Sequence, residues 1–173
     1  MTLCSFRGCA VSFFLAASST WAISPGAVIP SLAATNASGA PILVSGAAVP
    51  SAKLTYIDFW ASWCGPCKQS FPWMEAMNDK YGKNGLRIVA ITVDKKREDA
   101  EKFLKQLKPK FEIGFDPEGK TASALQIKAM PTSLLVDEKG KVLFVHNGFK
   151  LSDTDALEAQ MRAALEATYA PKK

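Results

Sequence analysis

The spacing of apolar residues changes several times along the chain and predicts alternating strands and helices. Residues 54–60 (Leu-Thr-Tyr-Ile-Asp-Phe-Trp) are rich in β-branched and aromatic side chains and form the strongest predicted strand. Residues 86–93 predict a second central strand. Further along, strands at 133–136 and 142–145, joined by a polar turn at 137–140, predict a hairpin.

Apolar residues spaced three and four positions apart predict three helices. The first has its apolar face at Phe71, Met74, Met77 and Tyr81, contains Pro72, which should kink it, and can end at Gly82. The second has its face at Ala100, Phe103, Leu104 and Leu107, and Pro109 stops it. The last opens at Ser152 with Asp155 in a capping-box pattern and continues through Leu157, Met161, Ala164, Leu165 and Thr168. Residues 121–126 form a short helix at most. This alternation predicts an α/β fold, a mixed sheet with helices packed on it.

The N-terminal region predicts export from the cytoplasm. Residues 1–22 have one positive charge, an apolar stretch and small residues at the end, as in a signal peptide cleaved after Ala22. A retained anchor is the alternative, but the apolar run is shorter than the roughly 20 residues that cross a bilayer. Residues 23–39, rich in Ala, Ser, Gly and Pro, predict a flexible leader, and residues 40–173 a single domain. We expect a periplasmic protein, membrane-tethered if the signal is not cleaved.

Cysteine count and charge narrow the class of protein. Removing residues 1–22 takes away Cys4 and Cys9 and leaves Cys64 and Cys67, which excludes a four-cysteine zinc site and a disulfide scaffold. The formal net charge is +5, but the basic residues are scattered along the sequence and no nucleic-acid-binding motif is present. We therefore expect no nucleic-acid partner.

The chemistry centres on the segment Trp63-Cys64-Gly65-Pro66-Cys67. A Cys-x-x-Cys spacing alone also fits half of a zinc site or a short structural disulfide. Here it follows a buried strand and opens a helix, where unpaired N–H groups and the helix dipole stabilise a thiolate. Cys64 is then the attacking sulfur and Cys67 the resolving thiol.

Two other positions are candidates for roles in the same site. Asp58 stands in an otherwise apolar strand, and it is interpreted as a proton acceptor for Cys67, with a solvent-facing or lysine-paired carboxylate as the alternative. In Met130-Pro131-Thr132, the proline is either an edge-strand device or a fixed turn. His146, the only histidine, is interpreted as structural.

Residues 57–68 (Ile-Asp-Phe-Trp-Ala-Ser-Trp-Cys-Gly-Pro-Cys-Lys), with Pro72 and Met130-Pro131-Thr132 downstream, closely resemble the thioredoxin superfamily. Residues 86–108 and 115–121 resemble its exported TlpA and ResA type. This resemblance implies a thioredoxin fold, with an N-terminal hairpin and an inserted strand-helix unit. It also implies a cis Pro131 beside Cys64. Two departures are Asp58, where many relatives have another residue, and Ala90, which replaces the lysine that faces the buried aspartate in cytosolic thioredoxins.

The predicted function is thiol-disulfide exchange with other proteins, in the reducing direction. The catalytic residues are Cys64, Cys67, Asp58 and Pro131, and the substrate-binding residues are Trp63, Gly65, Pro66 and Met130. The redox-active disulfide Cys64-Cys67 stands in place of a cofactor, and no metal is expected. The resemblance implies protein disulfides as substrates, as in cytochrome c maturation or copper-site assembly, and a membrane electron donor of the DsbD or CcdA type. We expect a monomer. The alternatives are a disulfide oxidase or isomerase, a thiol metal-binding module and an inert structural disulfide.

Overall fold

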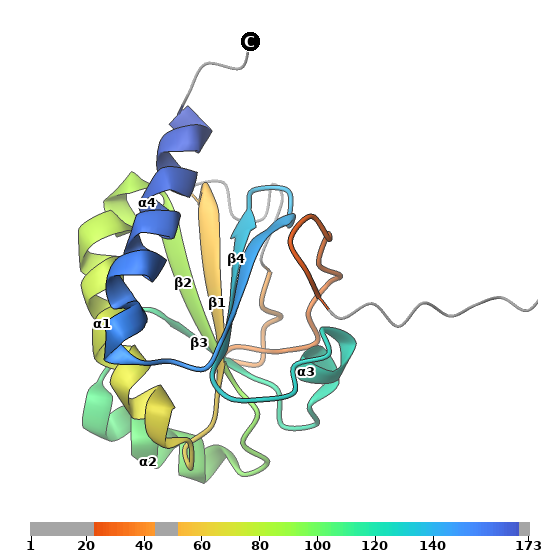
Figure 1. Ribbon diagram of the computed structural model, residues 1–173. Coiled ribbons are helices and arrows are strands. Elements are labelled where there is room, and N and C mark those ends of the chain that lie inside the picture. Colours follow the sequence, from red (N-terminus) through yellow and green to blue (C-terminus); the bar gives the residue numbers. More distant parts are fainter. Residues whose placement is uncertain (1–22, 44–51, 170–173) are drawn as a thin grey trace, which may run out of the picture.

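The computed structural model describes residues 23–43 and 52–169, and in these residues the sheet has five strands in the order β3-β2-β1-β4-β5 (Figure 1). The strands are β1 (Leu54–Trp60), β2 (Leu86–Thr92), β3 (Glu112–Phe115), β4 (Thr132–Asp137) and β5 (Val142–Asn147). β1, β2 and β3 are parallel, whereas β4 is antiparallel to both of its neighbours. The predicted mixed sheet and the hairpin β4–β5 are confirmed.

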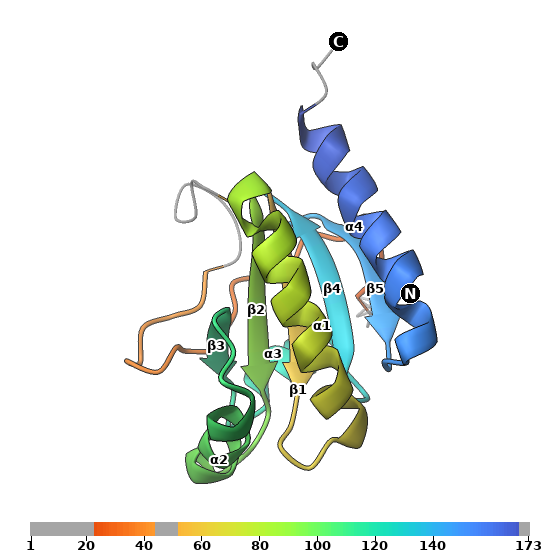
Figure 2. The same ribbon diagram turned by 90° about the vertical axis from the view of Figure 1, so that its left-hand side faces the viewer.

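Helices cover both faces of the sheet. They are α1 (Gly65–Tyr81), α2 (Arg97–Leu107), α3 (Lys120–Ala124) and α4 (Thr154–Tyr169), with short 3-10 turns η2 (Gly82–Asn84) and η3 (Leu151–Asp153). α1 and α4 lie side by side on one face, and α3 lies on the other (Figures 1 and 2). This layered arrangement is a thioredoxin fold.

The predicted helices form with small differences at their ends. α1 continues through Pro72 and ends at Tyr81, as the apolar spacing predicts. Gly85, just after η2, has a φ of 87°, and a Cβ there would lie 2.8 Å from Cγ of Lys53. Glycine is therefore required where the chain turns into β2. The last helix starts at Thr154 rather than at Ser152, because Ser152 lies in η3 and donates its hydroxyl to the neighbouring Asp153 carboxylate instead of capping the helix.

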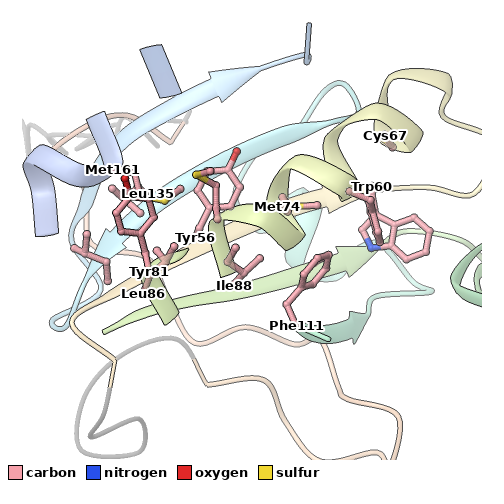
Figure 3. Close-up of a cluster of buried hydrophobic side chains, with 14 of the residues drawn as sticks. Tyr56, Trp60, Cys67, Met74, Tyr81, Leu86, Ile88, Phe111, Leu135 and Met161 are labelled. Atoms are coloured by element: carbon pink, nitrogen blue, oxygen red, sulfur yellow. The ribbon is translucent and has the colours of Figure 1, made fainter. Parts of the chain in front are cut away.

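Two apolar clusters fill the space on either side of the sheet. The first lies under α1, α2 and α4 and includes Tyr56, Trp60, Met74 and Met161 together with both active-site cysteines. Figure 3 shows side chains of this cluster from β1, β2, α1, β4 and α4 meeting over the sheet. Because Tyr56 and Trp60 face this cluster, Asp58 between them faces it as well.

The segment 23–43, here called the N-terminal strap, packs on the opposite face of the sheet. Ile29, Leu32, Ala34 and Ile42 are buried in the second cluster. The Ile29 amide donates to the Gly140 carbonyl, and Thr35 pairs with Phe115 of β3. Figure 1 shows the strap, in orange, on the side of the sheet away from α1 and α4. The prediction of a flexible leader over 23–39 is therefore wrong, because its spaced apolar residues cover an apolar sheet face.

Within the strap, the chain turns at residues 36–39 and forms isolated bridges rather than regular strands, so the N-terminal hairpin is reduced to the bridge between Thr35 and Pro41. The predicted signal peptide, residues 1–22, lies outside the described residues. Among the residues that are described, no helix is long and apolar enough to span a membrane.

Candidate active site

Cys64 and Cys67 form a disulfide at the start of α1. Cys64 is the N-cap residue, and its sulfur accepts a hydrogen bond from the Cys67 amide at 3.2 Å. Cys64 retains 4% of its surface exposed and Cys67 none. This difference fits the predicted order, in which the outer sulfur meets the substrate and the inner sulfur acts from within the protein.

The electrostatics of α1 favour a negative charge on Cys64 once the disulfide is reduced. The first turn of α1 contains no acidic residue, so no carboxylate of the helix itself offsets the positive end of its dipole. Pro66 occupies the first turn without breaking a helix hydrogen bond, because an N–H at this position has no partner within the helix. A thiolate at Cys64 would meet unpaired amides and the uncompensated dipole.

A buried carboxylate holds the loop between β1 and the disulfide. Asp94, just after β2, accepts hydrogen bonds from the Ser62 amide at 2.9 Å and the Ser62 hydroxyl at 3.0 Å. Its Oδ2 also accepts from the Thr92 hydroxyl at 2.8 Å. Asp94 therefore ties the cysteine loop to the neighbouring strand. Sequence analysis does not identify this residue, although an acid directly after a central strand was a usable signal, because strand ends gather at the site.

Asp58 lies beneath α1, fully inside the protein. The residue is 1% exposed, and its Oδ1 accepts a hydrogen bond from the Ser133 hydroxyl at 2.7 Å. Oδ2 is buried and has no hydrogen-bond partner among the described residues. Burial raises the pKa of Asp58 to about 7, and the Ser133 hydrogen bond lowers it only in part. Near neutral pH this carboxyl can therefore both take up and release a proton.

The neighbours of Asp58 leave its charge without a cationic partner. In the sheet register Asp58 lies between Ala90 of β2 and Ser133 of β4. The small Ala90 side chain cannot donate a hydrogen bond. Tyr56, two residues earlier on the same face, has its pKa raised by burial and by the Asp58 charge, and so stays neutral. Both alternatives to the proton-acceptor interpretation, a solvent-facing carboxylate and one paired with lysine, disagree with these surroundings.

Aromatic contacts place the middle of α1 over the stretch of β1 that contains Asp58. The rings of Trp60 and Phe71 lie 5.0 Å apart, and those of Tyr56 and Trp73 lie 5.8 Å apart. Since Trp60 and Tyr56 flank Asp58 on β1, the part of α1 around Phe71 and Trp73 packs over the stretch of β1 that contains Asp58.

Pro131 stands at the same end of the sheet. The Met130-Pro131 bond is cis, and pairing of Phe59 with Thr132 puts Pro131 at the end of β1, where the cysteine loop starts. The Pro131 carbonyl accepts a hydrogen bond from the Gly148 amide at 2.8 Å. Met130 packs partly buried against the cluster that contains both cysteines. The structure thus brings the predicted proline loop to the end of β1 from which the cysteine loop leaves.

The predicted substrate-binding residues on the cysteine loop are open to solvent. Trp63 is 74% exposed, and Gly65 and Pro66 are also exposed. Their contact with a substrate stays a prediction. His146 on β5 is half-buried, with Nε2 3.5 Å from the Asp153 carboxylate. Ser133, which sequence analysis does not identify, is a polar residue in an apolar strand two positions after Pro131, and this polarity was its only signal.

Comparisons with known proteins agree with this geometry. A family model described as Redoxin matches residues 24–163. The chain is 33% identical to the thiol-disulfide oxidoreductase ResA of Bacillus cereus over 91 residues, 53% of each chain. ResA of Bacillus subtilis (strain 168) is 30% identical over 96 residues, 56% of this chain and 54% of its own. These matches span about half the length of the curated relatives.

Among solved structures, one described as a thiol:disulfide interchange protein DsbE from Chlorobium tepidum matches with 45% identity and a TM-score of 0.74. The match covers 83% of this chain and 99% of that chain. StoA from Bacillus subtilis, 24% identical with a TM-score of 0.61, shares the fold over 80% of this chain and 99% of its own.

Proposed function

The chain belongs to the Redoxin family, and on that premise we propose that it is a thiol-disulfide oxidoreductase that reduces disulfides in other proteins. One observation carries the proposal. The Cys64-Cys67 disulfide caps α1, and the same helix packs through Phe71 and Trp73 over the stretch of β1 that contains a buried Asp58, which has one oxygen without a partner among the described residues. A buried carboxylate with a pKa of about 7 is expected at a site that transfers protons, whereas an inert structural disulfide does not require one.

The first step is attack on a substrate disulfide. In the reduced protein the Cys64 thiolate, stabilised by the start of α1, attacks one substrate sulfur. A Cys64–substrate disulfide forms, the substrate disulfide breaks, and the second substrate sulfur leaves as a thiolate that takes a proton from water. The exposed Trp63 beside Cys64 provides an apolar surface for the incoming segment.

The second step releases the substrate. Cys67 is a thiol until its proton is removed, and the free Oδ2 of Asp58 accepts that proton, directly or through a water. The Cys67 thiolate then attacks the Cys64 sulfur, the mixed disulfide breaks, and the substrate leaves with both sulfurs reduced. The protein has given up two electrons and holds the Cys64-Cys67 disulfide, the form seen in the structure.

The physiological setting is part of the same proposal. The predicted signal peptide supports a location of the protein outside the cytoplasm, where disulfides form readily and a disulfide reductase has substrates. Substrates of this kind include haem-attachment cysteines of apocytochrome c and thiols of copper-site proteins. Each turnover oxidises the protein, so a membrane thiol-electron donor of the DsbD or CcdA type would reduce it again.

Insulin reduction tests the activity. With dithiothreitol as electron source, the wild-type protein should accelerate precipitation of the insulin B chain, and Cys64→Ser should remove the acceleration. A Cys64→Ser variant as active as wild type would refute the mechanism. Lys139→Ala, in the β4–β5 turn at the opposite end of the sheet, is the matched control and should behave as wild type.

The reduction potential of the Cys64-Cys67 pair tests the direction. It is measured by equilibration with dithiothreitol or glutathione followed by thiol alkylation. A value near or below about −250 mV fits a protein that donates electrons, as thioredoxin does. A value near about −120 mV would mean that the protein installs disulfides instead.

A further inference from the structure

Each chain segment that borders the disulfide carries exposed lysine. We call these residues the lysine rim: Lys68, Lys95, Lys96, Lys128 and Lys150. In the sequence they are far apart, which is why the basic residues look scattered there. None of the five forms an ion pair with any described residue. The fold therefore gathers free positive charge at one end of the sheet.

Hydrogen bonds and chain continuity tie each of these segments to the site. Lys68 follows Cys67 in the first turn of α1. Lys95 and Lys96 follow Asp94, which is hydrogen bonded to Ser62 in the cysteine loop.

The other two lysines lie on the proline side of the disulfide. Lys128 comes two residues before Met130 in the loop that leads to Pro131. Lys150 comes two residues after Gly148, whose amide donates to the Pro131 carbonyl. In Figure 2 the ends of β1 and β2 that feed these segments point to the bottom of the view, where the yellow loop before α1 lies.

Acidic residues do not balance the rim. The stretches 61–70, 94–96, 125–131 and 147–151 contain five lysines and one acid, Asp94, which is buried and hydrogen bonded within the protein. Glu98 and Asp155 are exposed nearby, but each lies in the first turn of a helix, where the helix dipole offsets its charge. Of the other acids near this end, Asp99 pairs with Lys102 and Glu101 with Arg97, whereas Asp153 lies 3.5 Å from His146, which is charged only when protonated.

We propose that the lysine rim makes the protein select partner segments in which the reactive cysteine is flanked by acidic residues. This inference rests on the proposed disulfide exchange and names its substrate class. Exposed charges around a site change the rate of productive encounter more than they change the strength of the final contact. Positive potential around the disulfide would draw acidic segments in and repel basic ones, with rate effects of about tenfold or more at low salt.

Peptide disulfides of matched length test the proposal. Three substrates differ only in the residues next to the disulfide, which are Glu, Gln or Lys, and the reduced protein is mixed with each in turn. We expect the Glu peptide to be reduced about tenfold faster than the Gln peptide at low ionic strength, and the Lys peptide more slowly than both. At about 0.5 M salt, where the screening length falls to a few ångströms, the three rates should converge.

Two double Lys→Glu variants, one in the lysine rim and one far from it, test whether the preference depends on where the charge lies. Lys95→Glu/Lys96→Glu lowers the charge of the rim from +5 to +1, three lysines against two glutamates, and should remove most of the preference for the Glu peptide over the Lys peptide. Lys139→Glu/Lys141→Glu changes the net charge equally in the β4–β5 turn, at the opposite end of the sheet, and should leave the preference in place. An equal loss of the preference in both double variants would mean that only net charge matters and would overturn the proposal.

The remaining outcomes separate this inference from the proposed function. Equal rates for the three peptides at low salt would overturn the acidic preference while the exchange activity stands. Failure to reduce any of the peptides would overturn the exchange activity, and the preference with it.

Discussion

At the scale of single residues, the hydrogen bond between Ser133 and Asp58 decides which oxygen can act. The Ser133 hydroxyl occupies Oδ1, while Oδ2 has no partner among the described residues. A proton that reaches this carboxyl group therefore meets the free oxygen Oδ2. Ser133 thus gives the carboxyl group an orientation as well as a pKa.

The rate of mixed-disulfide resolution should follow the titration of Asp58. Because only the carboxylate accepts a proton, the rate should rise with pH through about 7 and then level off. Asp58→Asn should slow resolution by about 100-fold and leave the first attack by Cys64 unchanged. Stopped-flow measurement of both steps checks this, and equal resolution rates in the two proteins would contradict the role.

Ser133→Ala provides an independent test of the same group. The Ser133 hydrogen bond lowers the pKa of Asp58, so its removal should move the midpoint of the pH profile upward. A purely structural role of Ser133 would reduce stability without moving that midpoint.

The buried Asp58 should also make stability depend on pH. Its folded pKa of about 7 lies above the ordinary 3.8, so between these values the folded state binds a proton that the unfolded state releases. Stability therefore falls as pH rises through this window and stays low above it. A rise of about three units corresponds to roughly 4 kcal/mol.

Asp58→Asn removes that pH dependence. Relative to wild type it should gain stability at about pH 8, by up to roughly 4 kcal/mol, and gain little at about pH 4. Urea unfolding at both pH values measures the difference. An equal difference at the two pH values would show that Asp58 is not held protonated by burial.

At the scale of elements, the bond network of Asp94 joins β2 to the loop that carries Cys64. Asp94→Ala removes three hydrogen bonds and leaves the Ser62 amide without its partner, which should cost about 1–3 kcal/mol in unfolding free energy. Since the loop is held in its disulfide-bonded shape, the oxidised form should lose more stability than the reduced form.

Comparing the two redox forms makes this a test of positioning. A larger loss in the oxidised form means a more positive reduction potential for Asp94→Ala, measurable by equilibration with glutathione. Equal losses of stability in the two redox forms, with an unchanged reduction potential, would mean that Asp94 has only a structural role. Asp99→Ala, an exposed acid on α2, is the matched control.

The elements that sequence predicts well are those with a strong local period. β1, β2 and the helices with apolar stripes form where the pattern places them, because one face of each must be buried. The pattern does not predict β3, since it has only four residues and contains Gly114. A Cβ on Gly114 would lie 3.1 Å from Ile91 and 3.3 Å from Ile42, so close packing selects glycine where propensity would not.

The residues of the candidate site also fall into those that the sequence identifies and those that it does not. Cys64, Cys67, Asp58 and Pro131 could be found because a motif or an out-of-place charge marks each of them. The hydrogen-bond partner of Asp58 could not, because Ser133 reaches it only through strand pairing between distant parts of the chain. Ala90, the neighbour on the other side, is indicated only by the family resemblance and not by the local pattern. Pairing of distant strands is set by the whole sheet and leaves little trace in the local sequence.

At the scale of the whole molecule, the N-terminal strap runs across one face of the sheet and connects the β4–β5 end to the edge strand β3. The Ile29 amide bonds Gly140 beside the β4–β5 turn, and Thr35 bonds Phe115 on the far edge strand β3. Between these contacts, apolar side chains of the strap cover the sheet face opposite the disulfide. The strap therefore supports the sheet whose other face positions Asp58.

Two neighbouring residues of the strap allow a matched test of this role. Ile29 is 6% exposed and packs in the second cluster, whereas Val28 is 67% exposed. Ile29→Ala should lower the unfolding free energy by about 2–4 kcal/mol, because it removes buried methyl groups and leaves a cavity. Val28→Ala should change it by less than about 0.5 kcal/mol. Equal, small effects in urea unfolding would mean that the strap is loosely attached in solution, as a flexible leader would be.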